Sequence, residues 1–352
     1  MNNVFSKIKF LLQRPKVVIV TGQGKETSTS AIKQVLKANF KIGKDVLVYQ
    51  TDLKDNYDFE FLVKNASLAV LVASHVGEYH PDKEFFAAEK EQVVEISKLA
   101  EKLPAHSFLV LNFDDETVRD IKNNSSAHIL TFGFGVRADF QASDIVFIQP
   151  PLPGTNFKVN YQGKIVPVWL DKLFGKENIY AALSAVATGS ALDLHLVEIS
   201  KALGSYQGVS GHMKLIKGVK DSWILDDSAS ALPLSMVEGL DILKKIETEG
   251  RRVAALGDIL GIGRYTIETH ESIGERVKGS ADLLFTFGQR AKFYAQGAQH
   301  RGMENDKIFS YDQIKEGARV LQYEIREKDL VLVDGAKEMN MADVVKEIKA
   351  LD

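Results

Sequence analysis

The sequence predicts an α/β protein of two domains, each built on a parallel sheet covered by helices on both faces. First, the chain has 352 residues, more than a single core usually spans. Second, short β-branched apolar runs alternate with stretches of helical periodicity. Third, this alternation starts again after Gly204–Gly211, which holds three glycines and no helical period. We therefore place a domain boundary in that stretch.

The first domain opens with a predicted strand at Lys16–Thr21, followed by a glycine loop and a helix over Ser30–Ala38. A further helix is predicted over Lys83–Leu103. The other predicted strands are Val46–Tyr49, Leu68–Ala73, Phe108–Asn112 and Ile129–Phe132. These strands are continuous apolar runs and do not alternate with polar residues. That pattern is typical of parallel strands buried on both faces.

A proline-rich break at Pro150–Gly154 interrupts this alternation. Beyond it, Phe157–Val168 is predicted to form an antiparallel hairpin around Gln162-Gly163, because that pair suits a two-residue turn. A helix pair at Asn178–Leu192 and Leu196–Leu203 follows. Residues 1–15 are predicted to be a short helical segment ahead of the first domain.

The second domain repeats the pattern of strands and helices. Its predicted elements are Ser222–Leu225, Met236–Ile246, Arg252–Leu256, His270–Val277, Leu283–Phe287 and Leu330–Val333. The sequence thus divides into an N-terminal segment at 1–15, a central domain at 16–207 and a C-terminal domain at 208–352.

Composition excludes several classes of function. The 44 Lys and Arg residues against 47 Asp and Glu give a net charge of −3, so no overall basic field exists to hold a nucleic-acid backbone. The chain has no Cys, which rules out disulfides, thiolate metal sites and cysteine nucleophiles. The apolar stretch at the start is too short and too interrupted by lysine for a signal peptide or a membrane span. We expect a cytoplasmic protein.

The glycine loop at Gly22–Gly24 is the first candidate site. A loop between a buried strand and a helix presents backbone N–H groups at the positive end of the helix, which suits phosphate. A following Thr hydroxyl can hold Mg²⁺, and a lysine can reach the outer phosphates. The spacing Gly-x4-Gly-Lys-Ser/Thr is absent, so a tight turn lined by polar residues stays the alternative.

Several segments resemble the Mur ligases, the ATP-dependent enzymes that add amino acids to the peptidoglycan precursor. The segments, in family order, are Thr21–Thr29 (phosphate loop), Val76–His80 (Gly-x-x-His), Ala88–Glu91 (Ala-x-Lys-x-Glu), Leu111–Asp115 (Leu-Asn-Ala-Asp-Asp) and Gly175–Leu183 (Gly-Arg-His-Asn-x-x-Asn-Ala-Leu). In the second half, Ile224–Met236, Ala255–Leu260 with His270, and Asp334–Met341 resemble the D-alanyl-D-alanine-adding MurF branch. The resemblance spans about Lys16 to Ile348.

The resemblance implies a P-loop-type ATPase domain followed by a Rossmann-like C-terminal domain, with ATP and Mg²⁺ as cofactors. ATP would phosphorylate a carboxylate, and an amino acid or dipeptide amine would then attack it. The implied catalytic residues are Lys25, His80 and Lys90. The implied metal ligands are Thr27, His80 and Lys90, the last if carbamylated. The implied nucleotide-binding residues are Gly22, Gly24, Lys25, Thr27, Ser28, Asn112, Asp115, Asn178 and Asp227, with Asp227 at the ribose.

Three of these residues also have plain structural explanations. His80 precedes Pro81 and could cap a turn. Lys90 lies in the charged run Glu89-Lys90-Glu91, which is typical of a solvated helix face. Asp227 follows a buried strand, as a strand-end turn residue often does.

The chain departs from the family pattern at positions that carry chemistry. Glu26 occupies the usual lysine position of the loop, and Lys25 the usual glycine. The family's Glu-Met-Gly segment, whose Glu binds Mg²⁺, is missing between Gln50 and Ser67, where Glu60 is a weak substitute. Other polar family positions are changed to Ala181, His212, Ala229-Ser230 and Asp334–Lys337. Only residues 1–15 precede the first strand, where the family has a domain for a uridine nucleotide.

These observations favour an ATP-dependent amide ligase of Mur type, and the resemblance implies a role in peptidoglycan precursor synthesis. A partner chain could supply the missing substrate domain. The alternative is a Mur-like pseudoenzyme that binds or scaffolds, which the altered positions favour. A ligase like folylpolyglutamate synthase shares the central domain, but Leu256-Gly257-Asp258 argues for the MurF branch.

Overall fold

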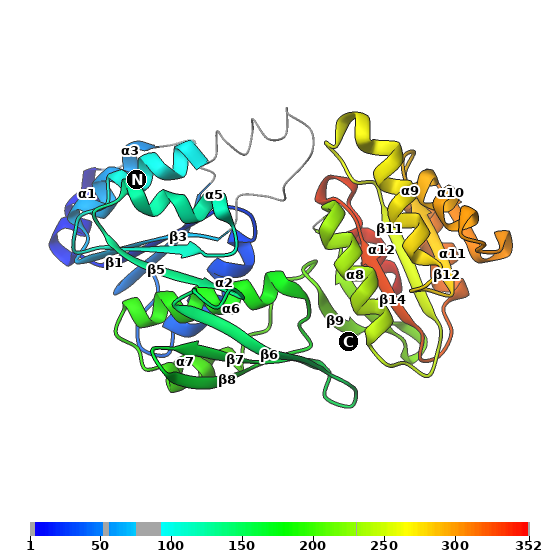
Figure 1. The fold of residues 1–352 in the computed structure, drawn as a ribbon, viewed down its shortest axis with the longest axis horizontal. Coiled ribbons are helices and arrows are strands. Elements are labelled where there is room, and N and C mark those ends of the chain that lie inside the picture. Colours follow the sequence, from blue (N-terminus) through cyan, green and yellow to red (C-terminus); the bar gives the residue numbers. More distant parts are fainter. Residues whose placement is uncertain (1–3, 52–55, 75–92, 230, 351–352) are drawn as a thin grey trace. The chain divides into compact units, whose positions relative to one another are not determined.

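The computed structural model describes residues 4–51, 56–74, 93–229 and 231–350. By their contacts the residues form two compact units (Figure 1). Unit 1 comprises Met1–Val146, Thr155–Asp171 and Lys176–Gln207. Unit 2 comprises Phe147–Gly154, Lys172–Gly175 and Gly208–Asp352. Each unit is an α/β structure, so the predicted fold class is confirmed.

The sheet of unit 1 has the strand order β2-β1-β3-β4-β5-β6-β7-β8. Neighbouring strands from β2 through β6 pair in parallel. The hairpin β7–β8 turns at Gln162 and Gly163, which both have positive φ, as a two-residue hairpin turn needs. The strands are β1 Lys16–Thr21, β2 Val46–Gln50, β3 Leu68–Ala73, β4 Phe108–Asn112, β5 His128–Gly133, β6 Phe140–Ile148, β7 Gly154–Tyr161 and β8 Lys164–Asp171.

Helices cover both faces of this sheet (Figure 1). On one face, side chains such as Val17, Ile19 and Leu71 pack into a core with α3 and the helical residues 93–101. On the other face α6 packs closely on α2 and α7, because a Cβ at Gly189 would lie 2.8 Å from Ile199 and 3.1 Å from Val35. The helices are α1 Val4–Gln13, α2 Lys25–Leu36, α3 Asn56–Asn65, α5 Glu116–Arg119, α6 Gly175–Ala191 and α7 Leu196–Leu203.

The N-terminal helix α1 is held on unit 1 by its apolar side. Phe10 is 4% exposed and belongs to the core. Its ring lies 5.6 Å from that of Phe61 on α3, and Lys7 lies 3.9 Å from Asp58 on the same helix. Residues 1–15 therefore contain a helix that packs against α3.

The sheet of unit 2 has the order β13-β12-β11-β14-β10-β9. The strands from β13 to β10 pair in parallel, and β9 pairs antiparallel with β10 at the edge. The strands are β9 Lys214–Lys217, β10 Trp223–Asp227, β11 Arg252–Gly257, β12 Leu283–Phe287, β13 Ile308–Tyr311 and β14 Leu330–Asp334.

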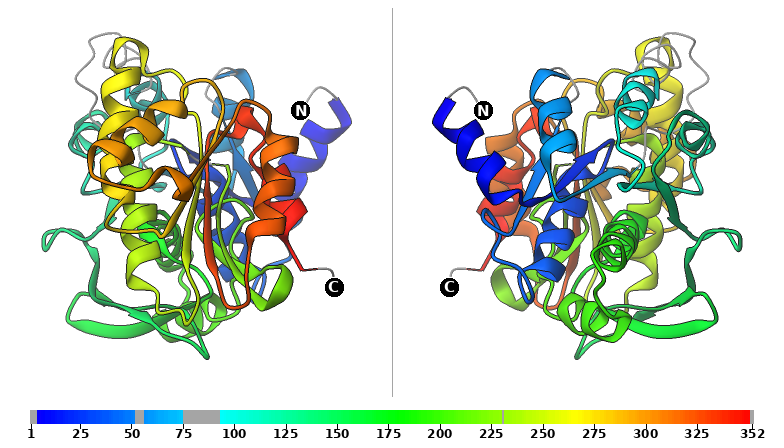
Figure 2. Two further views of the ribbon diagram at one scale, coloured as in Figure 1. Left: turned by 90° about the vertical axis from the view of Figure 1, so that its right-hand side faces the viewer. Right: turned by 90° about the vertical axis from the view of Figure 1, so that its left-hand side faces the viewer.

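Helices flank this sheet on both sides as well (Figure 2). In the left view of Figure 2, α11 and α12 (orange and red) lie on one side of the strands, with α8 and α9 (green to yellow) on the other. The helices are α8 Pro233–Lys245, α9 Thr266–Val277, α10 Lys292–His300, α11 Ile314–Glu324 and α12 Ala342–Ile348. Within the described residues, no helix is long and apolar enough to cross a membrane.

Candidate nucleotide site

The loop between β1 and α2 adopts a backbone that favours glycine. Gly22 has φ 92° and Gly24 has φ 70°, both in the left-handed region that side chains rarely adopt. The loop is tied to the neighbouring strand by Ser74, which follows β3. Its hydroxyl is hydrogen-bonded to the carbonyl of Thr21 at 3.1 Å and to the carbonyl of Gln23. The loop is therefore fixed by the sheet edge beneath it.

Thr27 lies in the first turn of α2 and is fully buried. Its hydroxyl oxygen is 2.8 Å from the carbonyl oxygen of Gly24 and 2.9 Å from Oε1 of Glu177, in the first turn of α6. The hydroxyl of Tyr206 donates to the backbone carbonyl of Thr27 at 3.1 Å. Contacts from its own loop, from α6 and from the segment after α7 thus fix Thr27.

Tyr206 acts as a hydrogen-bond donor at this position. Burial, and to a lesser extent the charge of Glu177, raise the pKa of the Tyr206 phenol. The phenol therefore stays protonated throughout the physiological range and keeps its donor to Thr27.

Lys25 and Glu26 occupy the first two positions of α2 and are half-buried. Lys25 follows the left-handed Gly24 directly, so the lysine stands at the end of the loop although it is shifted from the family spacing. Glu26 lies where the helix dipole is positive, which stabilises an acidic side chain. That placement gives Glu26 a local structural role.

The end of β4 brings further polar groups to the same edge. Asn112 is fully buried, and its Oδ1 accepts the backbone N–H of Asp114 at 2.9 Å. Its Nδ2 has no hydrogen-bond partner in the part of the chain that the structure describes. Asp114 accepts the backbone N–H groups of Phe134 and Gly135, at 2.6 and 2.9 Å. This arrangement joins the ends of β4 and β5.

Asp115, a predicted nucleotide ligand, is the N-cap of α5. Its Oδ1 accepts the backbone N–H groups of Thr117 at 3.0 Å and Val118 at 3.2 Å. That atom therefore has a structural role of its own, typical of an N-cap. The role of Asp115 toward a nucleotide stays a prediction.

Strand register places these groups along one edge of the sheet of unit 1. Thr21 pairs with Ala73, and Ala73 pairs with Leu111, so β1, β3 and β4 end together. Several predicted site residues lie at this edge or on helix α6, which covers it. They are Gly22, Gly24, Lys25, Thr27, Ser28, Asn112 and Asn178. In open α/β sheets, ligands bind beyond the carboxyl ends of the strands.

Asp227, predicted at the ribose, belongs to unit 2 and ends β10. It is 2% exposed, and its Oδ1 accepts the backbone N–H of Met213 at 3.1 Å. His270, part of the resemblance, is fully buried in α9 and accepts the backbone N–H of Ile259 at Nε2. His80 and Lys90 lie outside the described residues.

Three residues at this edge were missed by sequence reasoning: Ser74, Glu177 and Tyr206. Each lies far along the chain from the loop it contacts. Glu177 carried one signal, since it stands where the quoted family segment has His. Among the described residues, no group of three or more His, Asp and Glu side chains could hold a metal by itself.

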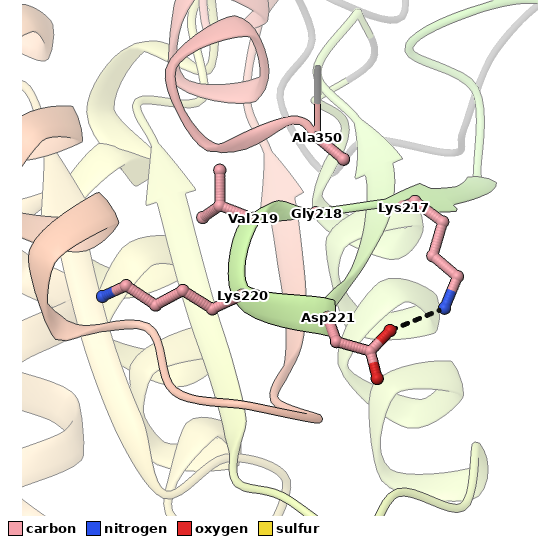
Figure 3. Close-up of a pocket in the computed structure, with 6 residues that line it drawn as sticks. All are labelled: Lys217, Gly218, Val219, Lys220, Asp221 and Ala350. Atoms are coloured by element: carbon pink, nitrogen blue, oxygen red, sulfur yellow. Dashed lines mark hydrogen bonds and ion pairs between the residues drawn. The ribbon is translucent and has the colours of Figure 1, made fainter. Parts of the chain in front are cut away.

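A surface hollow of about 450 Å³ lies in unit 2 (Figure 3). Lys217 forms an ion pair with Asp221 at 3.2 Å, while the Lys220 side chain points away from that pair. The Nζ atom of Lys220 donates to three carbonyls at the end of α11, those of Gln322, Tyr323 and Ile325, at 2.8–3.1 Å. These contacts indicate a helix cap at this hollow.

A parallel sheet with a left-handed glycine loop after its first strand, followed by a helix carrying Lys and Thr, is the arrangement typical of α/β proteins that bind phosphate. Residues 56–189 match the Mur ligase middle domain, and residues 211–337 match the Mur ligase glutamate ligase domain. The chain belongs to the Mur ligase family.

Individual relatives agree with this assignment. The chain is 22% identical over 361 residues to the UDP-N-acetylmuramoyl-tripeptide D-alanyl-D-alanine ligase of Bacillus subtilis, covering 95% of this chain and 76% of that protein. It is 31% identical over 148 residues to the UDP-N-acetylmuramate L-alanine ligase of Alkaliphilus metalliredigens, covering 42% of this chain and 32% of that protein.

Solved structures show the same fold. MurF from Acinetobacter baumannii superposes with a TM-score of 0.81 at 18% identity, covering 97% of this chain and 78% of that chain. MurF from Thermotoga maritima, solved in complex with ADP, gives 0.77 at 19% identity, covering 97% of this chain and 81% of that chain. At these identities the likeness is one of fold.

Proposed function

We propose that this protein is an ATP-dependent ligase of Mur type that forms an amide bond in peptidoglycan precursor synthesis. Its substrates are a carboxylate and an amino acid or dipeptide, as the names of its relatives suggest. The observation that carries the proposal is the anchored loop after β1, with Lys25 and Thr27 directly behind it. Nothing in the comparisons favours the scaffolding alternative.

The residues around the loop fit a nucleotide with a divalent cation. The left-handed glycines leave their backbone N–H groups uncovered by a Cβ, and α2 begins at Lys25 with its positive end toward the loop. The buried Nδ2 of Asn112 is a donor without a partner among the described residues. A buried donor of this kind costs stability unless a ligand or water satisfies it.

When bound, MgATP supplies the phosphoryl group that activates a carboxylate toward an amine. The chain contributes binding and charge neutralisation. Backbone N–H groups of the loop and of the first turn of α2 hold phosphate oxygens. Lys25 supplies positive charge to the phosphates, and the Thr27 hydroxyl supplies an oxygen to the cation. His80 and Lys90 are proposed, from the family resemblance alone, as further catalytic and metal-binding residues.

Calorimetric titration of MgATP tests this proposal. We expect micromolar binding, and Lys25→Ala should weaken it by about 2 kcal/mol, the size of a lost charged hydrogen bond. Lys33→Ala is the matched control, because Lys33 is exposed in the last turn of the same helix. Equal affinity in wild type and Lys25→Ala would remove Lys25 from the site.

Catalysis is tested separately by screening pairs of carboxylates and amines for ADP release. Release that requires both substrates supports the ligase. A wild-type protein that binds no nucleotide at millimolar concentration would contradict it and support the scaffolding alternative.

A further inference from the structure

Glu177 is the feature of this edge that no assigned role explains. It lies in the first turn of α6, is half-buried, and faces the phosphate loop across 150 residues of chain. Its Oε1 is 2.9 Å from the hydroxyl of Thr27. A Cβ built on Gly24 would lie 3.4 Å from Cγ of Glu177 and 3.6 Å from Oε1. The carboxylate therefore lies against both the loop and the first turn of α2.

The geometry of the Thr27 hydroxyl matters here. A hydroxyl has one proton to donate and two lone pairs, yet Thr27 has two acceptors within reach, Gly24 O and Glu177 Oε1. Donation to a carboxylate is the stronger of the two, because the acceptor is charged. With its proton directed to Glu177, the Thr27 oxygen keeps lone pairs for a cation.

The negative charge of Glu177 also favours a cation at this position. A carboxylate beside a phosphate loop repels a polyphosphate unless a cation lies between them. Hard divalent cations such as Mg²⁺ prefer oxygen ligands, mostly carboxylates together with phosphates and water. Glu177 and Thr27 supply such oxygens.

We propose that Glu177 is the carboxylate of a divalent-cation site that it shares with Thr27 at the phosphate loop. Glu177 binds the cation directly, or it accepts the proton of the Thr27 hydroxyl and so orients that oxygen toward the cation. The inference rests on the proposed nucleotide site, and it makes nucleotide binding by this chain tighter with the cation than without it. Without the cation, the same carboxylate opposes the phosphates.

The test measures ADP affinity calorimetrically, with Mg²⁺ and with EDTA. Wild type should bind ADP at least about tenfold more tightly with Mg²⁺, the size of one charge-assisted contact. Glu177→Gln should lose most of that ratio, and its affinity in EDTA should equal or exceed that of wild type. Glu177→Asp, which keeps the charge, should retain part of the ratio.

Glu198→Gln is the matched control, because Glu198 is an exposed acid in the first turn of α7 in the same unit. It should behave as wild type. Circular dichroism and thermal unfolding establish that each variant is folded. Glu177→Asp keeps the test valid if Glu177→Gln does not fold, since a shorter carboxylate should lower the Mg²⁺ ratio.

Electron paramagnetic resonance of Mn²⁺ gives a second readout without turnover. Wild type with ADP should immobilise one Mn²⁺ per chain, and Glu177→Gln should not. An unchanged Mg²⁺ ratio in Glu177→Gln, or tighter MgADP binding than wild type, would overturn the role of Glu177 while the proposed function stands. Absence of ADP binding to wild type under both conditions would overturn both.

Discussion

Asp334 is the last residue of β14, and its side chain is fully buried. It lies in register with Asp227 on β10 and with Leu256 on β11. Neither carboxyl oxygen has a hydrogen-bond partner among the described residues. Desolvation accordingly raises the pKa of Asp334 well above its ordinary value. A group with a raised pKa in the folded state loses its stabilising contribution as pH rises.

Asp334→Asn should therefore raise the free energy of unfolding at pH 7, because the amide carries no charge to desolvate; the gain is at most about 1.4 kcal/mol for each pH unit above the ordinary carboxyl pKa. The folded state binds more protons than the unfolded state from about pH 4 upward, so the gain should grow with pH above that value. Urea denaturation at several pH values measures it. Asp343→Asn, on the exposed side of α12, is the control. A gain that does not change with pH would contradict the prediction.

At the scale of single residues, the local pattern was enough to predict that Gly22, Gly24, Lys25 and Thr27 lie where the first strand meets the first helix of the sheet, while their roles toward a nucleotide stay predictions. Strand, glycines, lysine and hydroxyl follow one another in sequence, so one short segment encodes them. Glu177 could not be predicted in this way, because its contact with Thr27 depends on how α6 packs in the folded unit. Ser74 likewise reaches the loop only through the pairing of β1 with β3.

At the scale of elements, strands buried on both faces were predicted best. β3, β4 and β12 have the bounds that the sequence predicts, because each is a continuous apolar run. β6, β9 and β13 were not predicted. β9 and β13 are four-residue edge strands, and β6 contains polar Asp144 with positive φ. Their strand structure comes from pairing with a neighbour.

The cap of α11 by Lys220 should contribute measurably to stability. Its ammonium group donates to three carbonyls at the negative end of that helix, so Lys220→Met should lower the free energy of unfolding by about 1–2 kcal/mol. Chemical denaturation checks this value. Lys346→Met removes a surface ion pair with Asp343 and should cost less than about 0.5 kcal/mol. Equal losses in the two variants would refute the cap.

At the scale of the whole molecule, nucleotide should stabilise the folded chain by mass action. At about 100 times its dissociation constant, MgADP would add about 2.7 kcal/mol. For units of this size that corresponds to a rise in Tm of about 5–10 °C. Differential scanning calorimetry measures the shift, which Lys25→Ala should reduce. A transition unmoved by millimolar MgADP would argue against the site.

The two units are not consecutive in sequence, and this has a consequence for expressing either one alone. Residues 172–175 belong to unit 2, and Phe174 is buried there. The backbone N–H of Phe174 donates to the carbonyl of Met213, and the backbone N–H of Leu215 donates to the carbonyl of Lys172. A protein ended at Gln207, the domain boundary that the sequence predicts, would keep these residues without their partners. We expect it to aggregate, because stranded apolar side chains and an unpaired edge promote association. Comparing the soluble fraction of the truncated protein with that of the full chain tests this expectation.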